Sequence, residues 1–203
     1  MIKNIIFDFG DIFINLDKEA VFKELAKYGF TSLTSELDSL AKSYEQGLVS
    51  SKIFISNLIT IFPNTDETKI KNAWNSILLD FPLNRLEFLE NLAKENKYRL
   101  FLLSNTNEMH ISSVIETMGK DNFQRFKNCF EEFYLSHEIQ LRKPNADIYE
   151  YVLKQNNLTA TETIFIDDTK ENTDAAEELG IHCWNLQVGL EDIIDLKNKL
   201  PQC

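Results

Sequence analysis

Four short stretches of this sequence combine residue types that can carry out chemistry. They hold a carboxylate next to a glycine, a hydroxyl–amide pair, a lysine before a proline, and two adjacent carboxylates. In chain order they are Asp8-Phe9-Gly10, Ser104-Asn105-Thr106-Asn107, Lys143 and Asp167-Asp168. Each stretch alone is typical of a solvated turn or a helix cap, so the inference depends on the complete set.

Together these groups meet the requirements of phosphoryl transfer, in which positioning and charge neutralisation supply most of the catalysis. A carboxylate can attack phosphorus and form an aspartyl-phosphate, and Asp8 is the predicted nucleophile. Hydroxyl groups, backbone amides near a helix start and a lysine charge can hold the phosphate. The predicted phosphate and substrate ligands are Phe9, Gly10, Ser104, Asn105, Thr106 and Lys143.

The acidic residues also predict a magnesium site. Mg²⁺ prefers a few oxygen ligands together with waters and substrate phosphate. The expected ligands are Asp8, the backbone carbonyl of Gly10, and Asp168, while Asp167 and Asn172 orient them. Such a cation would offset the repulsion between an anionic nucleophile and an anionic phosphate.

Apolar runs alternating with helical patterns predict the elements that position these residues. The strands are expected near 5–7, 98–103, 133–135, 163–166 and 182–185. The helices are expected near 84–96, 108–118, 146–155, 171–179 and 190–200. This alternation is typical of an α/β protein with a doubly wound parallel sheet, whose ligands gather at the carboxyl ends of the strands.

Residues 16–82 follow a different pattern, with helical spacing throughout and no convincing strand. Helices are expected at about 18–28, capped by Asp17, and at 35–46, 51–61 and 68–79. We therefore predict a core domain of residues 1–15 and 83–203 with an all-helical cap domain of residues 16–82 inserted after the first strand. Tyr44, Glu45 and Phe81 are candidates for contacts with the leaving group.

The amino-acid composition restricts the classes of partner that the protein is expected to bind. The net charge of −11 repels phosphate backbones and anionic lipid, which argues against nucleic acid and membrane partners. Without a membrane-length apolar run or a secretory signal, a cytoplasmic location is expected. The three scattered cysteines, Cys129, Cys183 and Cys203, indicate reduced thiols, and the three scattered histidines indicate structural roles.

The four stretches, in this order, resemble the motifs of the haloacid dehalogenase superfamily, which consists mainly of magnesium-dependent phosphatases. The resemblance covers nearly the whole chain, and it is greatest to the capped branch similar to bacterial α-D-glucose-1-phosphate phosphatases. The resembling segments are 5–10, 103–107, 142–144 and 165–172. It implies a Rossmann-like core, a helical cap, Mg²⁺ and a small phosphorylated metabolite as substrate.

Gly10 departs from the family's usual first motif, Asp-x-Asp, whose second acid protonates the leaving group and activates water. Such assistance is typically worth about 100- to 10,000-fold. Asp11, Asp17 or water would have to replace it, or a good leaving group such as a sugar 1-phosphate would need it less. Two alternatives therefore stay open: a metal-independent 2-haloacid dehalogenase and a catalytically impaired phosphate-binding domain.

Overall fold

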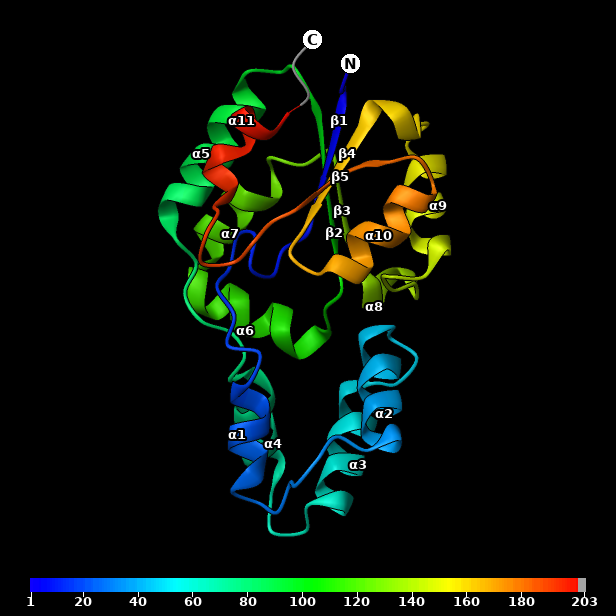
Figure 1. Cartoon of the computed structure of the whole chain (residues 1–203). Helices are drawn as coiled ribbons and strands as arrows, with labels where there is room; N and C mark the ends of the chain where they lie inside the picture. The colour runs from blue at the N-terminus through cyan, green and yellow to red at the C-terminus, as the bar shows by residue number, and fades with distance from the viewer. Residues whose placement is uncertain (201–203) are drawn as a thin grey trace.

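Five parallel strands form a single sheet in the order β3-β2-β1-β4-β5 (Figure 1). The computed structural model of the protein describes residues 1–200, and Cys203 lies outside this range. The strands are β1 (Asn4–Phe7), β2 (Arg99–Ser104), β3 (Glu132–Leu135), β4 (Thr163–Asp167) and β5 (His182–Asn185). The predicted α/β class with a parallel, doubly wound sheet is confirmed.

Both faces of the sheet are buried, which explains the unbroken apolar runs of the central strands. Along β1, Ile5 and Phe7 belong to the core on one face and Ile6 to the core on the other, as the two-residue period of a strand requires. The helices around the sheet lie on both sides of it (Figure 1). Those packed against the first face are α5 (Leu83–Lys94), α6 (Glu108–Met118), α7 (Lys120–Lys127) and α11 (Leu196–Lys199); those against the second are α9 (Ala146–Gln155) and α10 (Lys170–Glu178).

Most of the predicted elements are confirmed within a few residues, but three parts of the prediction differ from the structure. The helix expected at 190–200 is wrong, because Asp192 caps a short 3-10 turn, Ile193–Asp195, before the one-turn helix α11. Helices α7 and α8 (Ser136–Ile139) were not predicted. A second short 3-10 turn, Ala160–Glu162, precedes β4.

Four helices fill most of the segment 16–82 and lie apart from the sheet, at one end of the molecule (Figure 1). They are α1 (Ala20–Ala26), α2 (Ser35–Glu45), α3 (Ser51–Ile61) and α4 (Glu67–Asn75). Thr34, Ser50 and Asp66 cap the last three of them through their side chains. The predicted cap by Asp17 is wrong: its carboxylate accepts from the N–H of Glu19, which precedes the helix directly, and no side chain caps α1.

These four helices share a core of their own. It contains Tyr44, Phe54 and Ile70 among other apolar side chains, and Met109 of α6 also belongs to it. Two chain segments connect residues 16–82 to the sheet and run side by side. The N–H of Asn15 donates to the Asp80 carbonyl, and the N–H of Asp17 donates to the Ile77 carbonyl. Within residues 1–200, none of the helices is both long and apolar enough to span a membrane.

Candidate active site

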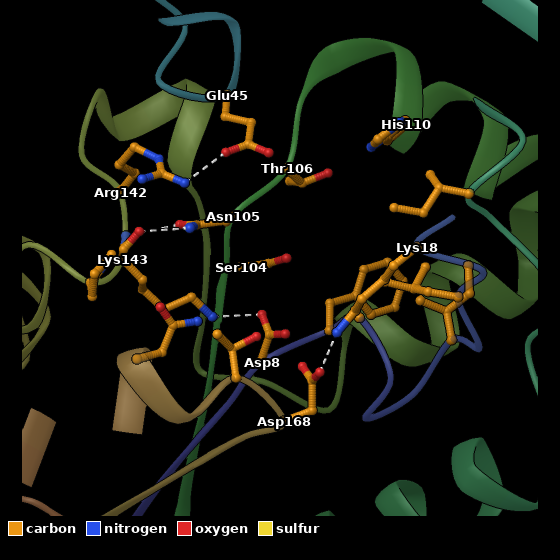
Figure 2. Close-up of a pocket in the computed structure, with 18 of the residues that line it drawn as sticks. Asp8, Lys18, Glu45, Ser104, Asn105, Thr106, His110, Arg142, Lys143 and Asp168 are labelled. Atoms are coloured by element: carbon orange, nitrogen blue, oxygen red, sulfur yellow. Dashed lines mark hydrogen bonds and ion pairs between the residues drawn. The ribbon is translucent and has the colours of Figure 1, made fainter. Parts of the chain in front are cut away.

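The predicted site residues meet at the carboxyl end of the sheet. A cavity of about 590 Å³ opens there between the strand ends and the 16–82 segment, lined by Asp8, Ser104, Lys143 and Asp168 together with residues of α2 and the linkers. Figure 2 shows these four side chains converging on one space. In β1, β2 and β4 the polar residue stands at the end of the strand or directly after it, so parallel register brings the groups to one edge.

Lys143 is the charge at the centre of the site. Its side chain is 1% exposed, and its ammonium donates to Asp8 Oδ1 at 2.7 Å, to Asp167 Oδ2 at 2.6 Å and to the Leu103 carbonyl at 2.9 Å. Burial opposes the charge of Lys143, but the carboxylates of Asp167 and Asp8 overcome it and raise its pKa. All three donors of the ammonium are therefore used inside the protein.

Asp8 has one oxygen left over. Lys143 contacts Oδ1, and within residues 1–200 no hydrogen-bond donor reaches Oδ2. Burial raises the pKa of Asp8 to about 7; the charge of Lys143 opposes this shift, and Asp167 adds to it. A cation or an electrophile in the cavity would therefore find a carboxylate with a free oxygen and few competing contacts.

Asp167 is fully buried and saturated with hydrogen bonds. Its Oδ1 accepts from the Thr169 N–H at 2.8 Å, and both oxygens accept from the Asn172 amide at 3.1 and 3.0 Å, in addition to the bond from Lys143. A carboxylate that accepts four hydrogen bonds from three groups has little capacity left for a metal. That Asp167 and Asn172 orient the metal ligands stays a prediction; the structure shows that these two residues are bonded to each other.

Lys18 is a site residue that sequence reasoning missed. Its ammonium pairs with Asp168 (Figure 2) and also, at 3.1 Å, with Asp11. Burial raises the pKa of Asp168, while Lys18 opposes this shift. Lys18 and Asp168 are 150 positions apart, and no sequence motif connects them. The one available signal was that Lys18 lies just after the segment that leads from β1 into residues 16–82.

The loop after β2 contains the predicted hydroxyl and amides. Within residues 1–200, no partner is found for the Ser104 hydroxyl or the Asn105 N–H, so both stay available to a phosphate. The Asn105 side chain exchanges two 2.9 Å bonds with the backbone of Lys143, which fixes the two loops together. The expectation for the Thr106 amide is wrong, because its N–H already donates to Ser136 Oγ at 2.9 Å.

The turn after β1 is tight and well packed. The Phe9 ring lies 5.2 Å from that of Phe126, so only the backbone of Phe9 can serve a ligand. A Cβ added at Gly10 would lie 2.8 Å from Leu16 Cδ1, and the place of the family's second acid is thus filled by a leucine methyl. Asp11 is engaged by Lys18 and by the N–H of Leu16.

Neither predicted substitute for the missing acid lines the cavity. Asp11 is buried beside the turn, and Asp17 contacts the backbone of Glu19 and lies near Lys23. Nothing in their contacts directs a proton toward the free oxygen of Asp8. The acid–base position therefore has no carboxylate substitute from either residue.

The rim of the cavity is formed from both parts of the chain. Arg142 donates to Glu45 of α2 at 3.1 Å (Figure 2), and burial raises the pKa of Glu45 against the opposing charge of Arg142. His110 also lines the cavity; burial lowers its pKa to about 4. Of the other two leaving-group candidates, Tyr44 stacks on Phe54 and Phe81 packs on Phe126, so both belong to apolar cores.

The acidic cluster fits a hard cation. Carboxylate oxygens of Asp8, Asp167 and Asp168 lie within 4.8 Å of one another, and each comes from the end of a rigid strand. Oxygen donors of this kind suit Mg²⁺ and not a softer metal. Because Asp167 is saturated, Asp8 and Asp168 are the carboxylates with capacity for the ion.

Comparison with known proteins agrees with this geometry. The family model described as haloacid dehalogenase-like hydrolase matches residues 5–186. The chain belongs to this family. The resemblance seen in the four stretches is confirmed.

Three proteins similar to this hydrolase have a known activity or a solved structure. A D-ribitol-5-phosphate phosphatase of Bacteroides thetaiotaomicron is 27% identical over 199 residues, covering 94% of this chain and 95% of the relative. A HAD family enzyme of the same organism, solved with magnesium and inorganic phosphate, has a TM-score of 0.76 at 30% identity and covers 94% of this chain and 97% of that one. A HAD-like family hydrolase from Porphyromonas gingivalis has a TM-score of 0.82 at 26% identity, with full coverage of both chains.

Neither of the two cysteines in residues 1–200 lines the cavity. Cys129 and Cys183 are free thiols, and burial raises their pKa to about 11 and about 12. Thiols of this kind are unreactive at neutral pH. Cys129 and Cys183 thus form no disulfide, in agreement with the expected reduced thiols.

Proposed function

We propose that this hydrolase is a magnesium-dependent phosphatase that cleaves a small phosphomonoester through an aspartyl-phosphate on Asp8. The observation that carries the proposal is the free Oδ2 of Asp8, which faces a polar cavity while Oδ1 accepts from Lys143. Two relatives support it: the D-ribitol-5-phosphate phosphatase, and the HAD family enzyme that was solved with magnesium and inorganic phosphate. Residues 16–82 serve in this proposal as the cap domain over the site.

Magnesium would be held by Asp8, by Asp168 and by the backbone carbonyl of Gly10. When bound, the ion supplies charge neutralisation between the carboxylate and the phosphate, and it favours the ionised form of Asp8. Asp167 and Asn172 keep the strand end in place through the bonds described above. The Lys18 ammonium divides its contacts between Asp168 and Asp11, so Asp168 keeps capacity for the ion.

The chain's own residues account for the binding and attack steps. The Ser104 hydroxyl and the Asn105 N–H donate to phosphate oxygens, and Lys143 adds positive charge beside them. Asp8 Oδ2 attacks phosphorus, the bond from phosphorus to the ester oxygen breaks, and the departing alcohol takes its proton from solvent. Water then attacks phosphorus, releasing the Asp8 carboxylate and a protonated phosphate.

The substrate we propose is a sugar or polyol phosphate. The cavity rim offers Lys42, Glu45 and Arg142, which suit hydroxyl groups better than an apolar chain. A relative that acts on ribitol 5-phosphate supports a substrate of this chemistry. Closure of the cap domain over the site would select the leaving group by its fit to this rim.

The test is phosphate release from sugar 1-phosphates, sugar 6-phosphates, polyol phosphates and an aryl phosphate, with Mg²⁺ or with EDTA. We expect activity that requires Mg²⁺ and that falls to the detection limit in Asp8→Asn. Asp147→Asn, an exposed aspartate in α9, is the matched control and stays active. Activity that survives both EDTA and Asp8→Asn would refute the proposal.

One alternative has a specific observation in its favour. The leucine methyl at the place of the second acid is compatible with a domain that binds phosphate without turnover. Phosphate binding by a protein that hydrolyses none of the panel would support it. A separate assay with chloroacetate and no Mg²⁺ tests the dehalogenase alternative, which halide release would indicate.

A further inference from the structure

Ser136 lies outside all four chemical stretches, yet its hydroxyl lies between the two parts of the site. The residue is fully buried at the junction of β3 and α8. Its Oγ accepts from the Thr106 N–H at 2.9 Å and lies 3.0 Å from the Thr106 carbonyl and 2.6 Å from the Glu45 carbonyl. One hydroxyl therefore contacts the loop after β2 and the last residue of helix α2.

On the core side, these contacts fix the phosphate loop, by which we mean residues 104–107. Ser136 accepts from the Thr106 N–H and lies within reach of the Thr106 carbonyl, and Asn107 caps α6 by accepting from the N–H of His110. The loop is thus held from behind, with the Ser104 hydroxyl and the Asn105 N–H left for a ligand. A small displacement of Thr106 would move both donors, and misplaced donors cost affinity steeply.

On the other side, the cap turn, residues 45–47, is seated on the core by a contact that only glycine permits. Gly47 has φ +67, and a Cβ there would lie 2.0 Å from the carbonyl oxygen of His137. The carboxylate of Glu45 pairs with Arg142 at 3.1 Å across the same junction. The cap turn, the phosphate loop and Ser136 therefore form one contiguous contact.

The hydroxyl can be satisfied in two arrangements. It has a single proton, which points at the Glu45 carbonyl when the cap turn is seated, because that acceptor is the nearer one. With the cap turn lifted, the same proton can turn to the Thr106 carbonyl, 3.0 Å away. A buried group with two available partners is a two-state element of the kind that couples distant sites.

We propose that Ser136 is a positioning residue that couples seating of the cap turn to the geometry of the phosphate loop. This inference rests on the proposed phosphatase function and adds a residue that the four stretches do not contain. Phosphate bound to the ordered loop stabilises the seated cap turn, and the seated cap turn strengthens phosphate binding to the same degree. A leaving group that prevents seating would then weaken phosphate binding at a distance.

The experiment measures the affinity of inorganic phosphate in saturating Mg²⁺ by calorimetry, for the wild type, Ser136→Ala, Gly47→Ala and the double variant. Couplings between sites are commonly about 5- to 150-fold, and we expect each single variant to bind about 10-fold more weakly. The double variant should bind no more than about 2-fold more weakly than either single one, because both changes break the same coupling.

Thr163→Val is the matched control for losing a buried hydroxyl. Thr163 is also fully buried, donates to the Thr159 carbonyl at 2.8 Å and contacts the Asn4 amide, but it lies at the opposite end of the sheet. Its loss should leave phosphate affinity unchanged. Hydrogen exchange of the wild type gives a test without any variant: Mg²⁺ and phosphate should slow exchange in the cap turn.

The outcomes separate the two proposals. A wild type that binds no phosphate overturns the proposed function and this inference with it. A wild type that binds phosphate while Ser136→Ala binds equally well overturns the inference alone. Fold-changes that multiply in the double variant, or cap-turn exchange unaffected by phosphate, also overturn it.

Discussion

Replacing Lys143 with methionine tests whether the centre of the site is held by charge. Methionine keeps the length of the side chain and removes the ammonium that contacts Asp8 at 2.7 Å and Asp167 at 2.6 Å. Two buried carboxylates would then face each other without their common partner. Breaking a buried ion pair by removing one member typically costs about 3–5 kcal/mol, and we expect Lys143→Met to lower the free energy of unfolding by this amount at pH 7.

The size of this loss should depend on pH. Burial raises the pKa of Asp8 to about 7 against the opposing charge of Lys143, so removing Lys143 moves the folded-state pKa further above the unfolded value. A carboxyl group with a raised folded-state pKa destabilises the protein as pH rises and stops doing so when it is protonated. The deficit of Lys143→Met should therefore shrink between pH 7 and pH 5.

Urea unfolding at both pH values measures the effect, with Lys3→Met as the matched control. Lys3 also pairs with an acid, Glu162, but its side chain is 61% exposed, so its loss should cost about 0–1 kcal/mol at either pH. A deficit below about 1 kcal/mol for Lys143→Met, or one that grows as the pH falls, would contradict the reasoning.

Two further predictions concern the rest of the cavity. Because burial lowers the pKa of His110 to about 4, the wild type should lose about 2 kcal/mol more than His110→Gln between pH 7 and pH 5 in urea unfolding, whereas equal losses would contradict this. Gly10→Asp should fold, since its Cβ meets the flexible end of Leu16, and should raise kcat on alkyl phosphates up to about 100-fold. A lower kcat would mean that the wild type already obtains its proton elsewhere and would exclude the non-catalytic alternative.

The sequence predicted the sheet well because buried parallel strands have an unmistakable composition. Ile5, Ile6 and Phe7 form a continuous apolar run, and the structure covers both of its faces. Long helices with a side-chain cap were predicted equally well, as Ser50 before Ser51–Ile61 shows. The four-residue helix Ser136–Ile139 is too short to show any periodicity, and residues near 190–200 have apolar spacing although Asp192 starts a 3-10 turn there.

The strand-end residues of the site could be predicted for a similar reason. Asp8 and Ser104 take their place directly from the strand that precedes or contains them, and parallel pairing then brings them together. Lys18 and Ser136 could not be found in this way. Their partners lie 150 and 91 residues away, and only the packing of the 16–82 segment on the sheet brings them within reach.

The residues around Gly10 show what occupies the place of the family's second acid. A leucine methyl fills the place of the second acid, and the nearest carboxylate in the turn, Asp11, is held by Lys18 and the N–H of Leu16. In the proposed phosphatase, neither position 10 nor Asp11 thus offers a side-chain acid to the departing oxygen. An oxygen that leaves as a weak base, such as the anomeric oxygen of a sugar 1-phosphate, needs that acid least. A primary alkyl phosphate needs it most, so the relative rates on these two esters report directly on the gap that Gly10 leaves.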